Sequence, residues 1–131
     1  MKRIIAVLAL ALCSLVAMAQ QQFSSVQILT SATATGAGEV HQPRCSLRTF
    51  QANGTTSAGA GSATIVIRGS NLSAPVAATA GHWVDLGTIT LTLSTTLSGD
   101  GVALFSTWRH VKAHVTAISG TDATVNAYMG C

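Results

Sequence analysis

The sequence predicts an all-β protein: a single antiparallel β-sandwich of about seven strands, jelly-roll or immunoglobulin-like, preceded by a signal-peptide helix. Three observations predict it. From about residue 23 onward the chain is rich in Thr, Ser, Ala, Gly and Val and lacks a long stretch of helical period. Several segments alternate apolar and polar residues. Clusters of turn-forming residues separate these segments at short intervals, which is typical of a sandwich or small barrel.

The N-terminus has the three parts of a secretory signal peptide. Lys2 and Arg3 precede an apolar run from Ile4 to Leu12, and the small-residue pattern Ala17-Met18-Ala19 follows. The apolar run is shorter than the roughly 20 residues that a membrane-spanning helix needs. We therefore expect residues 1–19 to be a cleaved signal peptide, the protein to be exported (secreted or periplasmic), and no stable membrane span to remain after cleavage.

Residues 20–131 are then expected to form one β-sandwich domain, since 112 residues suffice for one modest core. Cleavage at residue 19 removes two of the seven basic residues, so five basic and four acidic side chains remain and the net charge falls from +3 to +1. A nearly neutral domain lacks the strong basic surface typical of nucleic-acid binding, so no nucleic-acid partner is expected.

Two strands are predicted most clearly. In residues 88–93, Ile89, Leu91 and Leu93 point one way and three threonines the other, as in a half-buried antiparallel strand. In residues 108–118 the apolar side chains occupy the odd positions, so the odd face is expected to meet the core and the histidines at positions 110 and 114 to face solvent.

Further strands are predicted at residues 26–33, 45–52, 63–68 and 124–129, bounded by turn residues at 53–54, 69–71, 99–101 and 119–122. The segment 52–63 is rich in glycine and small residues, which favours a mobile loop or a tight connection between sheets. The phase of the alternation changes near Gly87, because Val84 and Leu86 are apolar at even positions and Ile89 at an odd one. A bulge or bend at Gly87 is expected there.

Cys45 and Cys131 are the two cysteines that remain after signal cleavage. An oxidising compartment would allow them to form a disulfide that ties the C-terminus to an early strand. The sequence leaves open whether they pair or are two unrelated thiols, because pairing requires their Cα atoms to lie close together. Cys45 and Cys131 are the candidate disulfide.

No motif for catalysis, a cofactor or a metal ion is found. His110 and His114 share a predicted strand face, but four residues of strand separate them by about 13 Å, too far to ligate one zinc ion together. His41 and His82 have no supporting Cys or carboxylate spacing. The acidic residues are scattered singly, mostly in turns, and neither a nucleophile elbow nor a phosphate loop occurs. No cofactor and no metal site are expected, and the chain is not expected to be an enzyme.

Trp83 and Trp108 are the large aromatic residues. On a β-sandwich, a Trp either packs in the core or stacks on a ligand such as a sugar ring. Each flanks a well-patterned strand, which favours packing in the core. Both residues are nevertheless kept as candidates for ligand stacking.

The order of small-residue, strand and turn motifs resembles that of small accessory β-sandwich proteins encoded by tailed bacteriophages. The similarity extends over most of residues 30–130, in segments 31–38, 49–61, 69–71, 83–91, 108–113 and 115–121. The resemblance implies a structural or decoration role on a virion, without catalysis and without assigned site residues. The signal peptide departs from this pattern, because virions assemble in the cytoplasm. Either a secreted bacterial protein shares the domain, or a virus uses an envelope-directed protein.

Two classes of function follow from the sequence. The first is a non-enzymatic structural or attachment protein, such as a phage-type virion surface or decoration β-sandwich, with itself (as a homo-oligomer) or other virion or cell-surface proteins as partners. The alternative is a secreted or periplasmic carbohydrate-binding module with a glycan partner and an exposed Trp83 or Trp108. A hydrolytic enzyme rests only on unpaired His and Ser residues, so no catalytic role is assigned to any residue.

Overall fold

A computed structural model describes residues 24–105 and 107–131, and the predicted signal peptide at 1–19 lies outside the described residues. Eight strands and one short 3-10 turn, η1 (Ala80–His82), make up the described fold. The strands are β1 (Ser25–Ala32), β2 (Gly36–Ala37), β3 (Leu47–Thr55), β4 (Ala58–Ser70), β5 (Val84–Leu93), β6 (Ser98–Phe105), β7 (His110–Thr121) and β8 (Thr124–Gly130).

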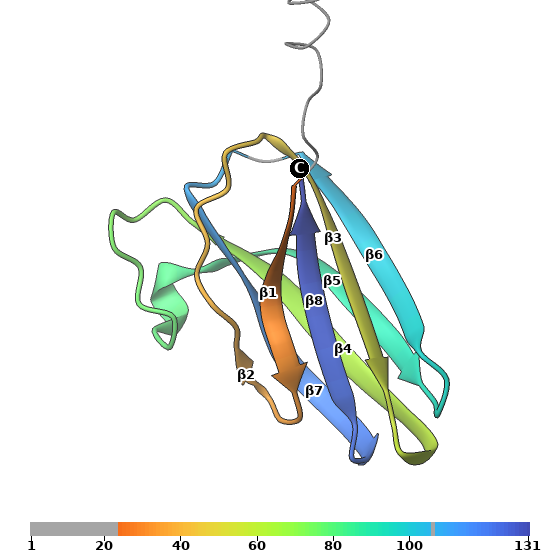
Figure 1. Ribbon diagram of the computed structural model, residues 1–131. Coiled ribbons are helices and arrows are strands. Elements are labelled where there is room, and N and C mark those ends of the chain that lie inside the picture. The colour runs from red at the N-terminus through yellow and green to blue at the C-terminus, as the bar shows by residue number, and fades with distance from the viewer. Residues whose placement is uncertain (1–23, 106) are drawn as a thin grey trace, which may run out of the picture.

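The strands form two four-stranded antiparallel sheets packed face to face (Figure 1). Sheet A has the order β1-β8-β3-β6, and sheet B has the order β2-β7-β4-β5. Strands that follow one another in the chain fall in different sheets, except β4 and β5, which are neighbours in sheet B. This is the strand order of an eight-stranded jelly roll, which decides between the two sandwich types that the sequence left open.

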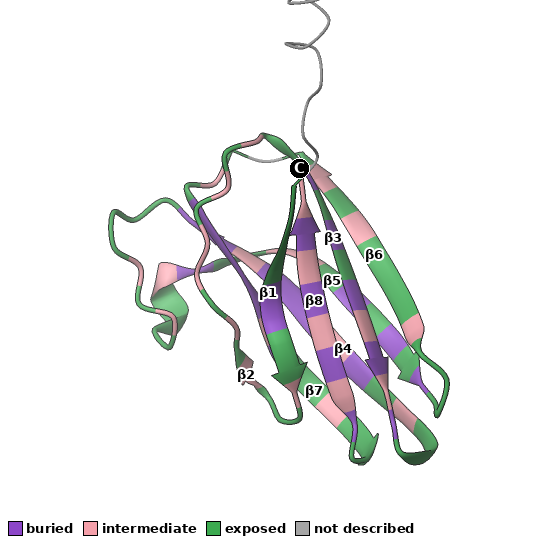
Figure 2. Cartoon of the chain, viewed as in Figure 1, coloured by how far each residue is buried: buried purple, intermediate pink, exposed green. Residues whose placement is uncertain are grey.

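The core lies between the sheets and consists of alternating side chains from both (Figure 2). Its fully buried members include Phe50, Ile65, Ile67, Val111 and Val125. In β5, Ile89, Leu91 and Leu93 are buried and the intervening threonines are exposed, as the period-two pattern predicts. The predicted irregularity at Gly87 is confirmed, since the register between β4 and β5 shifts at Ile67/Arg68 opposite Gly87.

The predicted turn at Asn53-Gly54 is wrong, because both residues continue β3. Gly54 faces the core, where a Cβ would lie 2.6 Å from the Thr124 carbonyl oxygen and 2.9 Å from Leu93 Cδ2. Glycine therefore allows close packing here instead of reversing the chain. The reversal is made by Thr56 and Ser57, so the segment 52–63 contains a tight connection between the sheets.

The predicted turn at residues 99–101 is also wrong. These residues lie within β6, where Gly99, Asp100 and Gly101 pair with Asn53, Ala52 and Gln51 of β3. Gly99 and Gly101 lie on the outer face of the strand, so the core loses no side chain at these positions. Val102 and Leu104 supply the side chains that pack against the core. The apolar alternation of Val102 and Leu104 was the sequence signal for this strand.

In β7, Val111, Ala113 and Val115 face the core as predicted, but Ala117 is exposed. A register shift between β4 and β7 at Thr64/Ile65 moves the inward position to Ile118, which packs against the core. The bulge therefore changes which residues of the last part of β7 point inward.

The prediction that the opposite face of β7 is exposed to solvent is wrong for the first residues of the strand. His110 is 4% exposed and Lys112 is 1% exposed. The amide nitrogen of Gln42 lies 2.8 Å from His110 Nε2, and the connection 71–83 between β4 and β5 covers Lys112. A second layer of chain therefore lies on the outside of sheet B, which the alternation alone does not reveal.

Candidate contact site at the disulfide end

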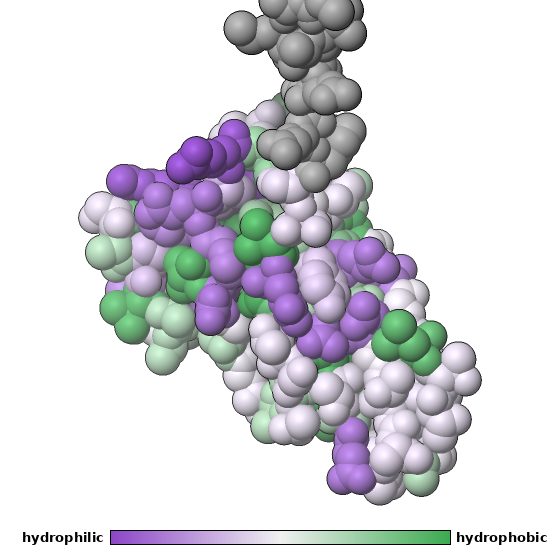
Figure 3. Space-filling model, viewed as in Figure 1, coloured by the Kyte–Doolittle hydropathy of each residue, from purple (hydrophilic) through white to green (hydrophobic). Residues whose placement is uncertain are grey.

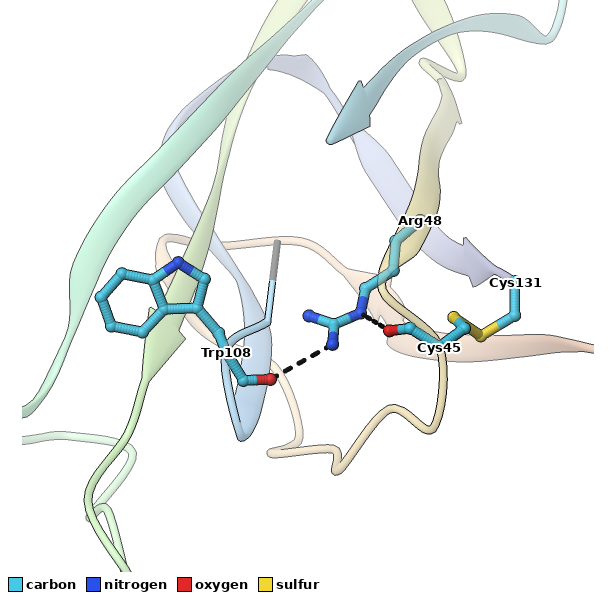
Figure 4. The surroundings of a disulfide bond; sticks show 4 residues. All are labelled: Cys45, Arg48, Trp108 and Cys131. Carbon is cyan, nitrogen blue, oxygen red and sulfur yellow. Dashed lines mark hydrogen bonds between the residues drawn. A yellow bond between two sulfur atoms is a disulfide. The ribbon is translucent and has the colours of Figure 1, made fainter. Parts of the chain in front are cut away.

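One end of the sandwich brings together segments that are far apart in the sequence. We call it the disulfide end: residues 42–48 before and at the start of β3, residues 107–109 between β6 and β7, and Cys131. The structure pairs Cys45 with Cys131 in a disulfide with a Cα–Cα distance of 5.8 Å (Figure 4). The Cys131 N–H also donates to the Ser24 carbonyl oxygen over 3.3 Å. The start of the described chain and its C-terminus are therefore joined to the same end of the sandwich.

Arg48 connects two segments of the disulfide end. Its Nε donates to the Cys45 carbonyl oxygen over 2.7 Å, and its Nη2 donates to the Trp108 carbonyl oxygen over 3.2 Å (Figure 4). The side chain is buried, and burial lowers the pKa of its guanidinium from the ordinary value. Arg48 therefore acts as an internal link between the segment before β3 and the segment before β7.

A depression of about 420 Å³ opens between these two segments. We call it the arginine depression, since three arginines line it. Its residues are Gln42, Pro43, Arg44, Cys45, Ser46, Arg48, Thr107, Trp108 and Arg109. None of the nine is acidic. Strongly hydrophilic side chains also gather on the upper part of the face seen in Figure 3, toward this end, and small residues of intermediate hydropathy cover much of the lower part.

A larger depression of about 520 Å³ lies along β1 and β2, between residues 28 and 39. It is lined mainly by small residues and hydroxyl groups, with Glu39 as its one ionisable residue. It offers less chemistry for recognition than the arginine depression, in spite of its size.

An exposed apolar pair lies on the outer face of sheet A at the same end. Leu47, at the start of β3, is the register partner of Phe105, at the end of β6. Leu47 is 60% exposed and Phe105 is 79% exposed. β6 is the edge strand of sheet A. Earlier in the same strand, the Gly101 N–H donates a hydrogen bond to the Asp100 carboxylate over 2.7 Å. The pair therefore stands beside an open sheet edge.

The two tryptophans occupy different environments. Trp83 is 8% exposed; its indole N–H donates to the Val76 carbonyl oxygen over 2.9 Å, and the Lys112 ammonium lies over its ring. Trp108 is partly buried, packs against the core and borders the arginine depression. Its indole points away from the disulfide (Figure 4). Of the two candidates for stacking, Trp108 has part of its surface open to a depression.

The histidines do not converge on a metal site. Among residues 24–105 and 107–131, no group of three or more His, Cys, Asp or Glu side chains is placed to hold a metal ion. In the same part of the chain, no helix has the length and hydrophobicity that crossing a membrane requires. The expected absence of a cofactor and of catalysis stays a prediction.

Sequence reasoning identified Cys45, Cys131 and Trp108 at this end but missed Arg44, Arg48, Arg109, Leu47 and Phe105. Arg44 and Arg109 are 65 positions apart along the sequence, and only the pairing of β3 with β6 brings the two segments together. The one available signal was an arginine next to a candidate cysteine and another next to a candidate tryptophan.

Comparison with known proteins finds solved structures of similar fold but no relatives by sequence. No family model matches the chain, and no curated protein matches it. The chain is similar to the PBSX exported protein XepA (9% identity, TM-score 0.48, covering 82% of this chain and 36% of that one). It therefore spans about a third of the length of XepA.

It is also similar to the SPBc2 prophage-derived protein YomS (14% identity, TM-score 0.45, covering 84% of this chain and 94% of that one). A third similar structure is a CBM4 structure (10% identity, TM-score 0.43, covering 85% of this chain and 68% of that one). Similarity at this level does not indicate a shared activity or partner.

Proposed function

We propose that this protein is a non-enzymatic structural or attachment protein, exported from the cell, and more specifically a surface or decoration β-sandwich of a phage-type virion. The observation that carries the proposal is the exposed Leu47–Phe105 pair at the open edge of sheet A. Large apolar side chains held together in water at the rim of a rigid scaffold favour a contact with another macromolecule.

A second copy of the chain is the partner that we propose for this pair. β6 ends its sheet without a further strand among the described residues, and Phe105 lies at the end of that free edge. Aromatic side chains are enriched in the centre of protein interfaces. A surface protein that occupies repeated positions is expected to associate by symmetry, which gives a homo-oligomer.

The Cys45–Cys131 disulfide supports export. Disulfides form and persist in oxidising compartments, and the N-terminal sequence has the pattern of a secretory signal. Both observations agree with a protein that works outside the cytoplasm, in the periplasm, in the medium or on a particle.

The test of the contact is the mass of the mature protein in solution. Light scattering after size-exclusion chromatography is expected to show an oligomer for the native chain and a monomer for Phe105→Ser. Val84→Ser is the matched control, since Val84 is an exposed apolar residue on β5, the edge strand of sheet B. A monomeric native chain, or equal behaviour of the two variants, would contradict the proposed self-association.

A carbohydrate-binding module is the second candidate function. One observation favours it: Trp108 borders a depression large enough for a small ligand. Trp83 gives it no support, since the Lys112 ammonium lies over its ring and a backbone carbonyl takes its indole N–H. If the protein is a carbohydrate-binding module, it should bind neutral sugars, and Trp108→Ala should abolish this binding.

A further inference from the structure

The arginine depression contains two cationic side chains that the fold does not use. The Arg44 and Arg109 side chains are exposed, and neither has a hydrogen bond or ion pair to another described residue. The backbone N–H of Arg109 donates to Asn71 Oδ1 over 3.0 Å, so the base of this side chain is held in place. Two exposed arginines, one from each of the two segments, thus line one depression.

The walls themselves are fixed by covalent and hydrogen bonds. The disulfide anchors Cys45, next to Arg44, and the buried Arg48 joins Cys45 to Trp108, next to Arg109. A ligand that bridges the two exposed arginines would therefore require little ordering of the backbone, which favours binding.

None of the four acidic side chains of the described chain lines this depression. Glu39 lies 3.9 Å from His41 Nε2. Asp85 pairs with Arg68 over 2.6 Å on sheet B, and Asp122 accepts a hydrogen bond from Ser57 over 2.8 Å at the turn between β7 and β8. Asp100 lies in the first half of β6, away from the disulfide end. The positive potential at the arginine depression is consequently uncompensated by its lining residues.

The size and chemistry of the depression indicate a class of ligand. A volume of about 420 Å³ lies in the range of small-ligand sites, and the depression is shallow and open, so that one sugar unit of a longer polymer can lie across it. Guanidinium groups match the planar or tetrahedral oxygens of carboxylate, sulfate and phosphate with two parallel hydrogen bonds. Trp108, next to Arg109, also lines the depression and is partly exposed.

We propose that the arginine depression binds an oxyanion-bearing saccharide unit of a cell-surface polymer, with Arg44 and Arg109 as the anion-binding residues. The proposal rests on the attachment role proposed above and gives that role a ligand class. It uses residues other than Leu47 and Phe105, so that self-association and saccharide binding can succeed or fail separately.

Calorimetric titration of the mature, disulfide-bonded protein tests the proposal. The charged probes are oligogalacturonate, which carries carboxylates, and a phosphorylated mannan, which carries phosphates. The methyl ester of oligogalacturonate is the uncharged control. Binding of either charged glycan, and at least about tenfold weaker binding of the ester, is expected. Whichever charged probe binds more tightly identifies the oxyanion. Failure of both charged glycans to bind, or equal binding of the ester, would overturn the proposal.

Two variants locate the site. Arg44→Gln and Arg109→Gln are each expected to weaken binding of the preferred glycan by about tenfold or more, with unchanged thermal unfolding. Arg68→Gln makes the same change of net charge on sheet B, away from the depression, and should leave binding within about twofold. Equal weakening by all three variants, or tighter binding of a poly-glutamate peptide than of either glycan, would overturn the assignment to a saccharide at this site.

Discussion

The ammonium group of Lys112 lies 4.2 Å from the centroid of the Trp83 ring, on the outside of sheet B. The same ammonium donates a hydrogen bond to the Ala77 carbonyl oxygen. Lys112 belongs to β7, whereas Ala77 and Trp83 belong to the connection 71–83, so one buried side chain fixes that connection against the sheet. Cation–π contacts of desolvated ammonium groups are among the stronger ones known in proteins.

Two substitutions of Lys112 distinguish the contribution of its apolar stem to stability from that of its charge. Burial, followed by the charge of Arg68, lowers the pKa of Lys112, because both disfavour the charged ammonium form. Lys112→Met keeps the apolar stem and is expected to change the free energy of unfolding by less than about 1 kcal/mol, whereas Lys112→Ala should lower it by about 2–4 kcal/mol.

Hydrogen exchange gives the second measurement on Lys112→Met. Loss of the bond to Ala77 and of the contact with Trp83 should speed amide exchange in residues 71–83 and leave β8 unchanged. If Lys112→Met is as destabilised as Lys112→Ala, or if exchange in residues 71–83 does not change, the anchoring role is contradicted.

The buried environment of His114 predicts that the protein loses stability in mild acid. Its pKa is lowered from 6.5, first by burial and then by the charges of Arg68 and Lys112, with Asp85 acting in the opposite direction. In the described chain its buried Nδ1 has no hydrogen-bond partner. The unfolded chain therefore takes up this proton before the folded chain does.

The free energy of unfolding should consequently be highest above pH 6.5 and decrease as the pH falls below that value. Urea unfolding at a series of pH values measures the slope, and His114→Asn should flatten it because asparagine does not titrate. The same slope in the variant and the native chain would rule out His114 as a source of the effect.

The disulfide is expected to make a large contribution to stability. It joins residues that are 86 positions apart, and closing a loop of this length stabilises a folded chain by roughly 3–5 kcal/mol in the chain-entropy description. The double variant Cys45→Ala/Cys131→Ala should lower the unfolding free energy by about that amount in denaturant titrations. A variant as stable as the native protein would show that the bridge does not restrict the unfolded chain.

Gly69 provides a test of the packing behind the arginine depression. A Cβ at this position would lie 2.6 Å from Trp108 Cγ and 2.8 Å from Leu86 Cδ1. Gly69→Ala must therefore displace the indole, and we expect it to lower the free energy of unfolding by about 1–3 kcal/mol. It should also shift the tryptophan fluorescence.

Gly81→Ala is the matched control, because a Cβ at Gly81 would have no atom within 4 Å. It should leave both the stability and the fluorescence spectrum unchanged. Equal effects of the two substitutions would show that contact with Trp108 is not the cause.

The class of fold was predictable because alternation reports burial directly. In residues 88–93 every apolar side chain faces the core, as the period-two pattern indicates. Prediction failed where glycine had a role other than turning the chain: Gly54 allows close packing and Gly101 lies in an edge strand. Glycine marks both a turn and a close approach, and a single sequence does not distinguish them.

The candidate site was less predictable than the fold. Cys45 and Cys131 were recognised because cysteine has few roles in an exported protein. Arg44 and Arg109 carried no such signal, since a single exposed arginine is ordinary and only the jelly-roll topology places the two around one depression. The burial of His110 and Lys112 also depends on a connection, residues 71–83, whose position over the sheet has no periodic signature.

The central claim is that the protein is exported and works by contact as part of a surface assembly. Intact-mass measurement of the protein from its native source tests it most directly, applied separately to the medium, the cell envelope and any virus particles, with and without reduction. We predict a chain that begins after residue 19, contains the Cys45–Cys131 bridge, and is found with particles or another surface assembly. A full-length, reduced and monomeric chain recovered from the cytoplasm, and absent from every surface fraction, would contradict the account.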